Sequence, residues 1–405
     1  MKFSRLSQLF LVSAIGLILG TLLTACQLVT IDYVFVACSA GTTAGSDGQI
    51  YTYAVDSSSG ALRTAAPVVD TGGTGPVAMA TTSNYYNLYV ANQGNKSVVH
   101  FSINTHGILA LKDSVTLANT PVSIAVNAAN SYLYVVSGTG TATLTEYPIS
   151  SSDGTIGSAA ATQQLTIPGY ASDSVVPAGV MVLANSNAVF VTAYDKSAYN
   201  PGGNTTSNAN PGWLFGYAVG SGGSLTPVLG SPYQAGVKPS GLASDPTSRF
   251  IFVTDFASNE LIGYTVLASD TLQLMINGPF KTGNEPTSVA IDPRGIYIYL
   301  SDSLDSAVSA YSVALPTGTP STIVSATGSG GNATDTDPVS IIVEPAEGRF
   351  VYTANYLGNS VSGFKLDPNT GTLSLTQATP YPTGANPTAL IAVPHGNHAS
   401  QTPVD

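Results

Sequence analysis

One short pattern recurs along the chain: a residue followed by proline, and then an apolar strand. It occurs seven times, at Gly75-Pro76, Thr120-Pro121, Val176-Pro177, Lys238-Pro239, Glu285-Pro286, Asp337-Pro338 and Asn386-Pro387. The successive prolines lie 45, 56, 62, 47, 52 and 49 residues apart. A period in that range, with about four strands in each repeat, predicts a β-propeller. Proline suits the first position of a strand because no ladder bond needs its missing N–H.

The second residue after each of these prolines is small. The seven positions hold Ala78, Ser123, Gly179, Gly241, Ser288, Ser340 and Ala389. The inner strands of a propeller converge on its axis, where large side chains would collide. We therefore expect the proline-opened strands to be the innermost of four strands per blade, called A to D here from the axis outwards.

The other strands of each repeat follow in a constant order. The B strands are expected at residues 88–91, 132–136, 189–193, 250–254, 296–300 and 350–354, and the C strands at 98–103, 214–219, 261–266, 308–313 and 361–366. These segments are rich in β-branched and aromatic residues. In such a meander the D-to-A and B-to-C connections share one face, which we call the channel face. The A-to-B and C-to-D turns share the opposite face.

The two ends of the array are complementary. Residues 33–38 match a B strand without an A strand before it, and residues 388–393 match an A strand without a B strand after it. Pairing them completes a seventh blade and removes two exposed sheet edges. We predict an all-β, seven-bladed β-propeller of four antiparallel strands per blade over residues 33–395, with a C-terminal tail at 396–405. A pair of β-sandwich domains, the alternative, explains neither the spacing nor the complementary ends.

The N-terminal segment predicts export and lipidation. Lys2 and Arg5 precede an apolar run at residues 9–23, and the sequence Leu23-Thr24-Ala25-Cys26 ends it. This resembles the lipobox of bacterial lipoproteins, which implies removal of residues 1–25 as a signal peptide, acylation of Cys26 and a linker at 26–32. A single-pass anchor fits less well because the run is short and ends at small residues. We expect a lipid-anchored protein of the bacterial cell envelope, on the periplasmic or the outer-membrane, cell-surface side.

Charge argues against binding of nucleic acid, and the cysteine content argues against a disulfide. The 405-residue chain has a net charge of −11, and 9% of its residues are charged. Removing residues 1–25 removes two basic groups, so that 10 basic and 23 acidic residues give a net charge of −13. Such a surface repels nucleic acid, which is therefore not an expected partner. With Cys26 acylated, Cys38 has no disulfide partner and is expected to be a small core residue.

Two B-to-C segments carry a family resemblance. Tyr89-Val90-Ala91-Asn92 is followed by Asn95 and Val98, and Tyr352-Thr353-Ala354-Asn355 is followed by Asn359, Ser360 and Val361. They resemble the signature of the seven-bladed lactonase family, which includes 6-phosphogluconolactonase-like and carboxymuconate-lactonising propellers, and which is related to surface-layer propellers with a Tyr-Val-Thr-Asn (YVTN) repeat. The resemblance implies a site at the mouth of the central channel, made of histidine, arginine and an acidic residue.

This sequence departs from that implied site. The histidine would directly follow an inner-strand proline, and the seven positions hold Val77, Val122, Ala178, Ser240, Thr287, Val339 and Thr388. None of these acts as a general acid or base near neutral pH. The histidines are His100, His106, His395 and His398, and Arg249, Arg294 and Arg349 are expected in A-to-B turns, on the opposite face. No cofactor or metal motif accompanies them, and the oxygen-rich run 332–337 lacks the spacing of an EF-hand loop.

Other polar residues are expected on the channel face. Lys238, Glu285 and Asp337 precede inner prolines, beside Asn386, and the B-to-C connections add Asp195, Asp255 and Asp302. Together they would bind a small polar ligand or a cation. The longest connection, residues 194–212, leads to Trp213, the only tryptophan, which would anchor a ligand or a partner. The alternative for the charged residues is a solvated turn, and for Trp213 packing against its own blade.

Three functions stay open on the sequence alone. The first is a lipid-anchored propeller that binds a ligand or a protein, with a degenerate catalytic set and no cofactor. The second is an active lactone hydrolase, a carboxylic ester hydrolase of 6-phosphogluconolactonase type, which would use Lys238, Glu285 and Asp337. The third is a structural envelope repeat protein. The lack of histidine and arginine at the channel-facing positions favours the first and the third. The membrane, through Cys26, is an expected partner in each case.

Overall fold

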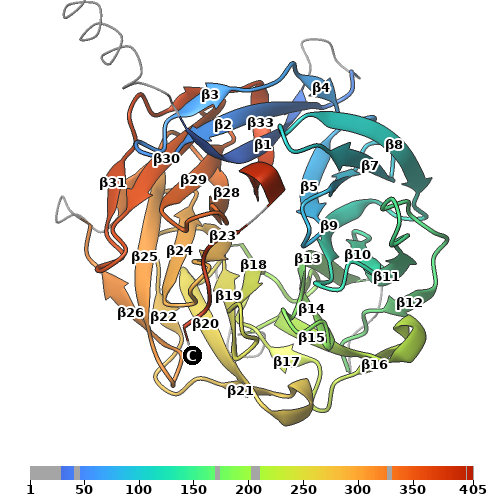
Figure 1. Ribbon diagram of the computed structural model, residues 1–405. Coiled ribbons are helices and arrows are strands. Elements are labelled where there is room, and N and C mark those ends of the chain that lie inside the picture. The colour runs from blue at the N-terminus through green and yellow to red at the C-terminus, as the bar shows by residue number, and fades with distance from the viewer. Residues whose placement is uncertain are drawn as a thin grey trace, which may run out of the picture.

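Seven antiparallel sheets surround a central axis in the computed structural model of the chain (Figure 1). The structure describes residues 29–40, 46–168, 174–201, 210–325, 331–397 and 399–404. The predicted signal peptide, Cys26 and His398 lie outside these residues. The prediction of an all-β propeller with seven blades is confirmed.

Each blade is a four-stranded meander, and within the described residues five blades add a short strand beside the third one. Blade 1 contains β33 (Ala385–Pro394), β1 (Thr30–Ala40), β2 (Gln49–Asp56), β3 (Leu62–Thr64) and β4 (Val69–Asp70). Blade 2 contains β5 (Pro76–Thr81), β6 (Asn87–Asn92), β7 (Ser97–Ile103) and β8 (Leu109–Thr116). Blade 3 contains β9 (Pro121–Val126), β10 (Tyr132–Ser137), β11 (Thr143–Pro148) and β12 (Ala161–Gln164). Blade 4 contains β13 (Val175–Val182), β14 (Ala188–Asp195), β15 (Gly212–Val219), β16 (Leu225–Pro227) and β17 (Tyr233–Gln234).

The last three blades repeat the same plan. Blade 5 contains β18 (Pro239–Ser244), β19 (Phe250–Asp255), β20 (Glu260–Val266), β21 (Leu272–Leu274) and β22 (Phe280–Lys281). Blade 6 contains β23 (Pro286–Ile291), β24 (Tyr297–Asp302), β25 (Ala307–Ala314), β26 (Thr319–Ile323) and β27 (Asn332–Ala333). Blade 7 contains β28 (Pro338–Val343), β29 (Phe350–Asn355), β30 (Ser360–Leu366), β31 (Leu373–Leu375) and β32 (Tyr381–Pro382). Short 3-10 turns in the described residues include η2 (Ser221–Gly223), η3 (Ala268–Asp270) and η4 (His395–Asn397).

The first blade closes the ring with strands from both ends of the chain. β1 pairs antiparallel with β33, with Tyr33 opposite Val393 and Val36 opposite Leu390. This confirms the predicted pairing of the two ends. β1 begins at Thr30, three residues before the predicted strand, and Cys38 is buried within it, as expected.

The inner strands approach one another closely, which explains their small residues. A Cβ atom added to Gly241 would lie 2.8 Å from the Cα of Ser288 in the next blade, and one added to Gly179 would lie 2.7 Å from a methyl carbon of Leu242. Such distances leave no room for a side chain. Five inner strands begin at their proline, whereas β13 and β33 begin two residues earlier.

Tyrosines of the B strands tie one blade to the next. The hydroxyl of Tyr89 donates to the carbonyl of Gly154 at 2.6 Å, that of Tyr299 to Gly371 at 2.8 Å, and that of Tyr352 to Gly60 at 2.7 Å. In each case the glycine lies in the C-to-D turn of the following blade and has a positive φ. The tyrosine of the resembled signature therefore has a structural role in this chain.

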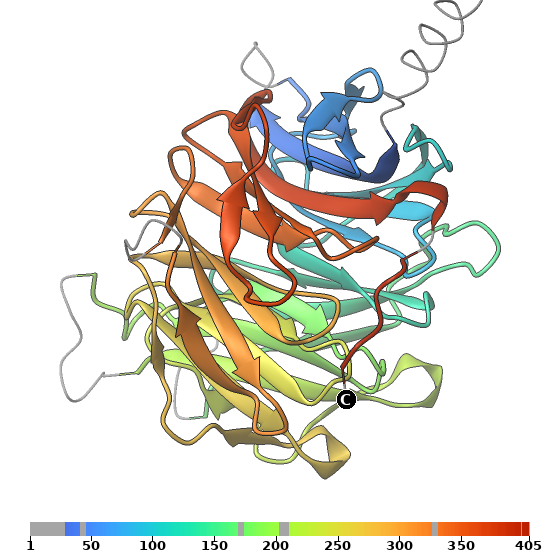
Figure 2. The same ribbon diagram turned by 60° about the vertical axis from the view of Figure 1, so that its left-hand side comes forward.

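Both described ends of the chain lie on the face opposite to the channel face. β1 starts there and β33 ends there, and the segment that follows η4 runs across this face (Figures 1 and 2). The amide of Ser400 donates to the carbonyl of Ala346, that of Val404 to Arg294, and the Arg249 guanidinium to the carbonyl of Val404. Within the described residues, no helix has the length and apolar character needed to cross a membrane.

Candidate functional site on the channel face

The positions that follow the inner prolines are occupied by structural contacts. The hydroxyl of Ser240 donates to the carbonyl of Pro286 at 2.7 Å, that of Thr287 to Pro338 at 2.9 Å, and that of Thr388 to Pro76 at 2.8 Å. Each bond joins the inner strand of one blade to that of the next. The other four positions hold Val77, Val122, Ala178 and Val339. None of the seven positions therefore presents a group that takes up or releases a proton near neutral pH.

Lys238 is held between aromatic rings. Its Nζ lies 4.3 Å from the centre of the Phe256 ring and 5.4 Å from that of Tyr199, distances at which a cation is attracted to a ring face. Tyr199 belongs to the long connection of blade 4, and its ring meets that of Tyr194 edge-on at 5.5 Å. Lys238 is half-buried, so its charge is directed into this aromatic cluster between blades 4 and 5.

Glu285, Asp337 and Asn386 share an unusual backbone conformation. Their φ angles are 56°, 62° and 52°, in the left-handed region that costs most residues about 1–2 kcal/mol. Gly75, at the same place before the inner strand of blade 2, has a φ of 63°. Asparagine and aspartate tolerate this region better than glutamate does. Glu285 is thus the least favourable residue of the four for its backbone.

The structure does not join the three predicted catalytic candidates to one another. Among the described residues, no ion pair involves Lys238, Glu285 or Asp337. The Asp337 carboxylate accepts a hydrogen bond from the hydroxyl of Ser303 instead. The amide of Glu285 donates to Asn259 at 2.8 Å, which fixes the backbone and leaves the side chain half-buried.

Asp195 and Asp255 lie inside their blades, at the last positions of β14 and β19, and both are fully buried. The Asp255 carboxylate accepts the amide protons of Val237 at 2.7 Å and Lys238 at 2.9 Å, and so fixes the segment that enters the inner strand. Asp195 accepts both the amide and the hydroxyl of Ser197. Both carboxylates are therefore used in hydrogen bonds to the connections of their own blades, and a role in binding a ligand stays a prediction.

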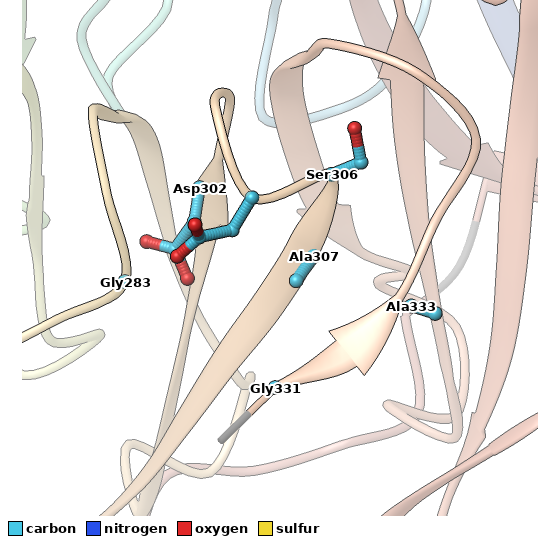
Figure 3. A pocket seen from close by; sticks show the side chains of 7 residues that line it. Gly283, Asp302, Ser306, Ala307, Gly331 and Ala333 are labelled. Atoms are coloured by element: carbon cyan, nitrogen blue, oxygen red, sulfur yellow. The ribbon is translucent and has the colours of Figure 1, made fainter. Parts of the chain in front are cut away.

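Asp302 occupies the same place in blade 6 and lines a pocket. The pocket has a volume of about 370 Å³ and is lined by Gly283, Asp302, Asp305, Ser306, Ala307, Gly331 and Ala333 (Figure 3). The Asp302 side chain is 1% exposed, and its Oδ2 accepts the hydroxyl of Ser309 at 2.6 Å. Burial, with a smaller contribution from the charge of Asp305, raises the pKa of Asp302 to about 7.

Trp213 packs against the hydrophobic core between blades 3 and 4. Its Nε1 is buried and meets no acceptor among the described residues. Trp213 therefore packs against its own blade, as the alternative interpretation expected. A role as an anchor for a ligand or a partner stays a prediction. The middle of the connection before it, residues 202–209, lies outside the described residues.

The described histidines and the A-to-B arginines lie away from the channel face. His100 is buried within blade 2, between Asp113 and Asn87, His106 is in a C-to-D turn, and His395 is in η4. Arg249, Arg294 and Arg349 are in A-to-B turns, as predicted, and pair with Asp245, Asp292 and Glu347. In the part of the chain that the structure describes, no three His, Cys, Asp or Glu side chains are placed to hold a metal ion.

Sequence reasoning missed four residues of this face: Asp305, Gly283, Tyr199 and Phe256. Gly283 carries a usable signal, because glycine also stands three residues before the inner proline at Gly73, Gly236 and Gly384. Added Cβ atoms at Gly73, Gly236 and Gly283 would meet the side chain that ends the neighbouring B strand, so these glycines mark close packing. Asp305, Tyr199 and Phe256 are single residues in loops, and nothing repeated along the chain distinguishes them.

The sheet topology defines the chain as a seven-bladed β-propeller. A family model described as "Lactonase, 7-bladed beta-propeller" matches residues 36–180 and 231–398, more than half of the chain. The chain therefore belongs to that family. The unmatched segment, 181–230, contains most of blade 4 with its long connection and Trp213. A search of the curated proteins finds no sequence that matches.

Solved structures share the fold at low sequence identity. The periplasmic gluconolactonase PpgL of Pseudomonas aeruginosa superimposes with a TM-score of 0.73 at 16% identity, over 90% of this chain and 99% of that one. A Bacteroides uniformis protein described as a "putative 6-phosphogluconolactonase" gives a TM-score of 0.71 at 16% identity, over 90% and 100% of the two chains. A Lactobacillus plantarum protein gives 0.70 at 16% identity with the same coverage. At this identity the likeness is one of fold.

Proposed function

We propose that the protein is a lipid-anchored propeller of the bacterial cell envelope that binds a ligand or a protein on its channel face and does not hydrolyse lactones. One observation carries the proposal: the inner-strand positions next to the prolines are used for hydroxyl ties or apolar packing. Opening a lactone needs a base for water and a donor or cation for the developing oxyanion. The channel face supplies no histidine or arginine for these tasks among its described residues.

The position of the N-terminus gives this proposal an orientation. Residues 27–29 alone separate Cys26 from β1, which begins on the face opposite to the channel face. The four Cα-to-Cα steps from Cys26 to Thr30 span at most about 14 Å. A lipid on Cys26 would hold the opposite face towards the membrane and leave the channel face free for ligands. The periplasmic location in the name of PpgL agrees with an envelope location.

The second candidate function is lactone hydrolysis. It is favoured by the family and by the names of two structural neighbours, and here it would need Glu285 as the base and Lys238 as the cation, one blade apart. The third candidate, a structural repeat protein, would need no ligand at all.

Turnover of lactones separates the first candidate from the second. Full-length protein in detergent should open 6-phosphogluconolactone and glucono-δ-lactone no faster than buffer, with PpgL as the positive control for gluconolactone. Saturable turnover that disappears in both Glu285→Gln and Lys238→Met would reject the proposal and establish the hydrolase. Binding of a defined ligand, tested below, separates the first candidate from the third.

A further inference from the structure

The pocket beside Asp302 has small walls and an acidic end. Gly283, Ala307, Gly331 and Ala333 leave the space open, and the described lining residues include two carboxylates, Asp302 and Asp305, and no basic side chain. In Figure 3 the Asp302 carboxylate lies between the Gly283 segment and the strand that begins at Ala307, and the Ser306 hydroxyl points away from it. A Cβ atom added to Gly283 would lie 2.6 Å from Asp302 Oδ2 and 2.8 Å from Asp305 Oδ2, so the two carboxylates converge there.

A comparison with blade 5 shows what is different about Asp302. There Asp255 accepts the amide protons of Val237 and Lys238, the two residues before the inner proline. In blade 6 these two amides belong to Asn284 and Glu285.

The amides of blade 6 have other partners. The amide of Asn284 donates to Asp305 at 2.7 Å, and the Asn284 side chain donates to the same carboxylate at 2.8 Å. The amide of Glu285 donates to Asn259 at 2.8 Å. In blade 6, Asp305 and Asn259 therefore accept the two amide protons that the single residue Asp255 accepts in blade 5.

The exchange leaves one carboxylate oxygen without a donor. Asp302 Oδ1 is buried and has no hydrogen-bond partner of good geometry among the described residues, while Oδ2 is bound to Ser309. The backbone amides of Gly283 and Ser309 lower the pKa of this carboxyl but do not offset the effect of its burial. A buried acceptor without a donor costs about 1–3 kcal/mol, and more when it is charged. The site is therefore short of a donor, and preferably a positively charged one.

We propose that this pocket binds a small organic cation that carries N–H donors, a primary ammonium compound, with Asp302 Oδ1 and the Asp305 carboxylate as acceptors. An ammonium supplies both the hydrogen bonds and the charge that the site lacks. The Ala307 and Ala333 methyl groups provide contacts for its methylene groups. The volume suits a small molecule better than a bare metal ion, and the described residues offer no third metal-ligating side chain at this site.

This inference deepens the proposed binding function and rests on it only for its biological meaning. Binding of an ammonium compound would be found whether or not lactones are hydrolysed. Failure of the binding test leaves the lactone result untouched, so the two can be told apart.

Binding should strengthen as pH rises from 6 to 8. The proton on Asp302 competes with the ligand, and the ionised form that binds a cation becomes dominant as pH passes the pKa of about 7. The titratable groups that face Asp302 are Asp305, on the turn after β24, and Tyr311, on β25. Burial raises the pKa of Tyr311, so the tyrosine stays neutral over this range.

Isothermal titration of full-length protein in detergent with 1,4-diaminobutane tests the proposal. We expect saturable binding that weakens at least tenfold in Asp302→Asn. This variant should fold, because asparagine ends the B strands of blades 2 and 7, as Asn92 and Asn355. Gly283→Ala, which adds a methyl group between the two carboxylates, should also abolish binding. Asp153→Asn, at an exposed turn of blade 3, is the charge-matched control and should bind as the wild type does.

Two further titrations identify the chemistry. Tetramethylammonium has the charge without N–H donors and should bind at least tenfold more weakly than 1,4-diaminobutane. Calcium chloride should neither bind nor compete. The proposal is overturned if the diamine does not bind, if both pocket variants bind it as the wild type does, if tetramethylammonium binds equally well, or if calcium binds at Asp302 in its place.

Discussion

The hydroxyl of Ser240 lies 2.7 Å from the carbonyl oxygen of Pro286 and donates a hydrogen bond to it across the boundary between blades 5 and 6. Thr287 makes the same contact to Pro338 one blade further on. These residues occupy the place where a catalytic histidine was expected from the family resemblance. The innermost ring thus uses hydroxyl groups to hold neighbouring blades together.

Removing one of these hydroxyl groups should destabilise the protein. Ser240→Ala and Thr287→Val each remove a half-buried hydrogen bond, and each should lower the free energy of unfolding by about 1 kcal/mol. Unfolding in urea measures the change. Ser221→Ala, at an exposed serine of η2, should change it by less than about 0.5 kcal/mol. Unchanged stability in both inner-ring variants would show that the ties contribute nothing net.

The left-handed backbone of Glu285 gives a prediction of opposite sign. Glu285→Gly should raise the free energy of unfolding by about 1 kcal/mol, because glycine has no steric penalty at a φ of 56°. Lys238 holds the same position in blade 5 and is not among the described residues with positive φ. Lys238→Gly should therefore lower stability, by roughly 0.5–1 kcal/mol. Destabilisation by Glu285→Gly would mean that the glutamate side chain makes stabilising contacts that exceed its backbone cost.

Acylation of Cys26 remains a prediction, and metabolic labelling tests it. Cells grown with a labelled fatty acid should label the wild-type protein and leave Cys26→Ser unlabelled. Cys38→Ser is the matched control and should be labelled as strongly as the wild type. Cys38 is fully buried, and burial raises the pKa of its thiol to about 11, so it has no reactive thiolate at neutral pH. Label in the Cys26→Ser protein would contradict the lipobox interpretation.

The fold was predictable because its signals repeat. Seven prolines, seven small residues and two complementary ends each point to the same ring, and a repeated signal tolerates the failure of one copy. β11 shows such a failure: Thr143 and Glu146 interrupt the apolar pattern of a C strand, and the sequence did not reveal it. The short fifth strands, of two residues each, also gave no signal of their own.

The details of the site were less predictable because they depend on which neighbour satisfies each amide. Asp255 and Asp302 look alike in the sequence, and both were expected to contribute to a channel-face site. The Asp255 carboxylate accepts the two amide protons that precede the inner proline of its blade. In blade 6 the corresponding amides donate to Asp305 and Asn259 instead of Asp302. That difference arises from the conformations of individual loops. The repeat in the sequence does not predict these conformations.

A second buried carboxylate, Glu146, lies where a B-strand tyrosine would otherwise donate a hydrogen bond to the next blade. The hydroxyl of Tyr134, the B-strand tyrosine of blade 3, has no carbonyl partner among the described residues of the next blade, and it is buried beside the Glu146 carboxyl. A Cβ atom added to Gly223, in η2 of blade 4, would overlap an oxygen of Glu146. The Glu146 carboxyl thus fills the place at the blade boundary where the other tyrosines meet a turn.

Glu146 should make the stability of the protein depend on pH. It is fully buried, and burial raises its pKa to about 7 from an ordinary value of 4.5. Between these two values the folded protein keeps a proton that the unfolded chain has lost. Unfolding then releases a proton, so the free energy of unfolding falls as pH rises through this window. Below pH 4.5 the stabilising contribution is fully present, and above about pH 7 it is lost.

Glu146→Gln tests this prediction, because glutamine has nearly the same shape and no charge. Wild-type protein should lose stability between pH 5 and pH 7.5, and Glu146→Gln should reduce that loss by roughly 1–3 kcal/mol in urea unfolding at the two pH values. Some loss should persist, because burial also raises the pKa of Asp32 and Asp302. Asp153→Asn should not reduce the loss, since hydrogen bonds from Ser150 and Thr155 lower the pKa of Asp153. Equal pH dependence in the wild type and in Glu146→Gln would mean that Glu146 is ionised in the folded protein at pH 5, with its charge compensated at the blade boundary.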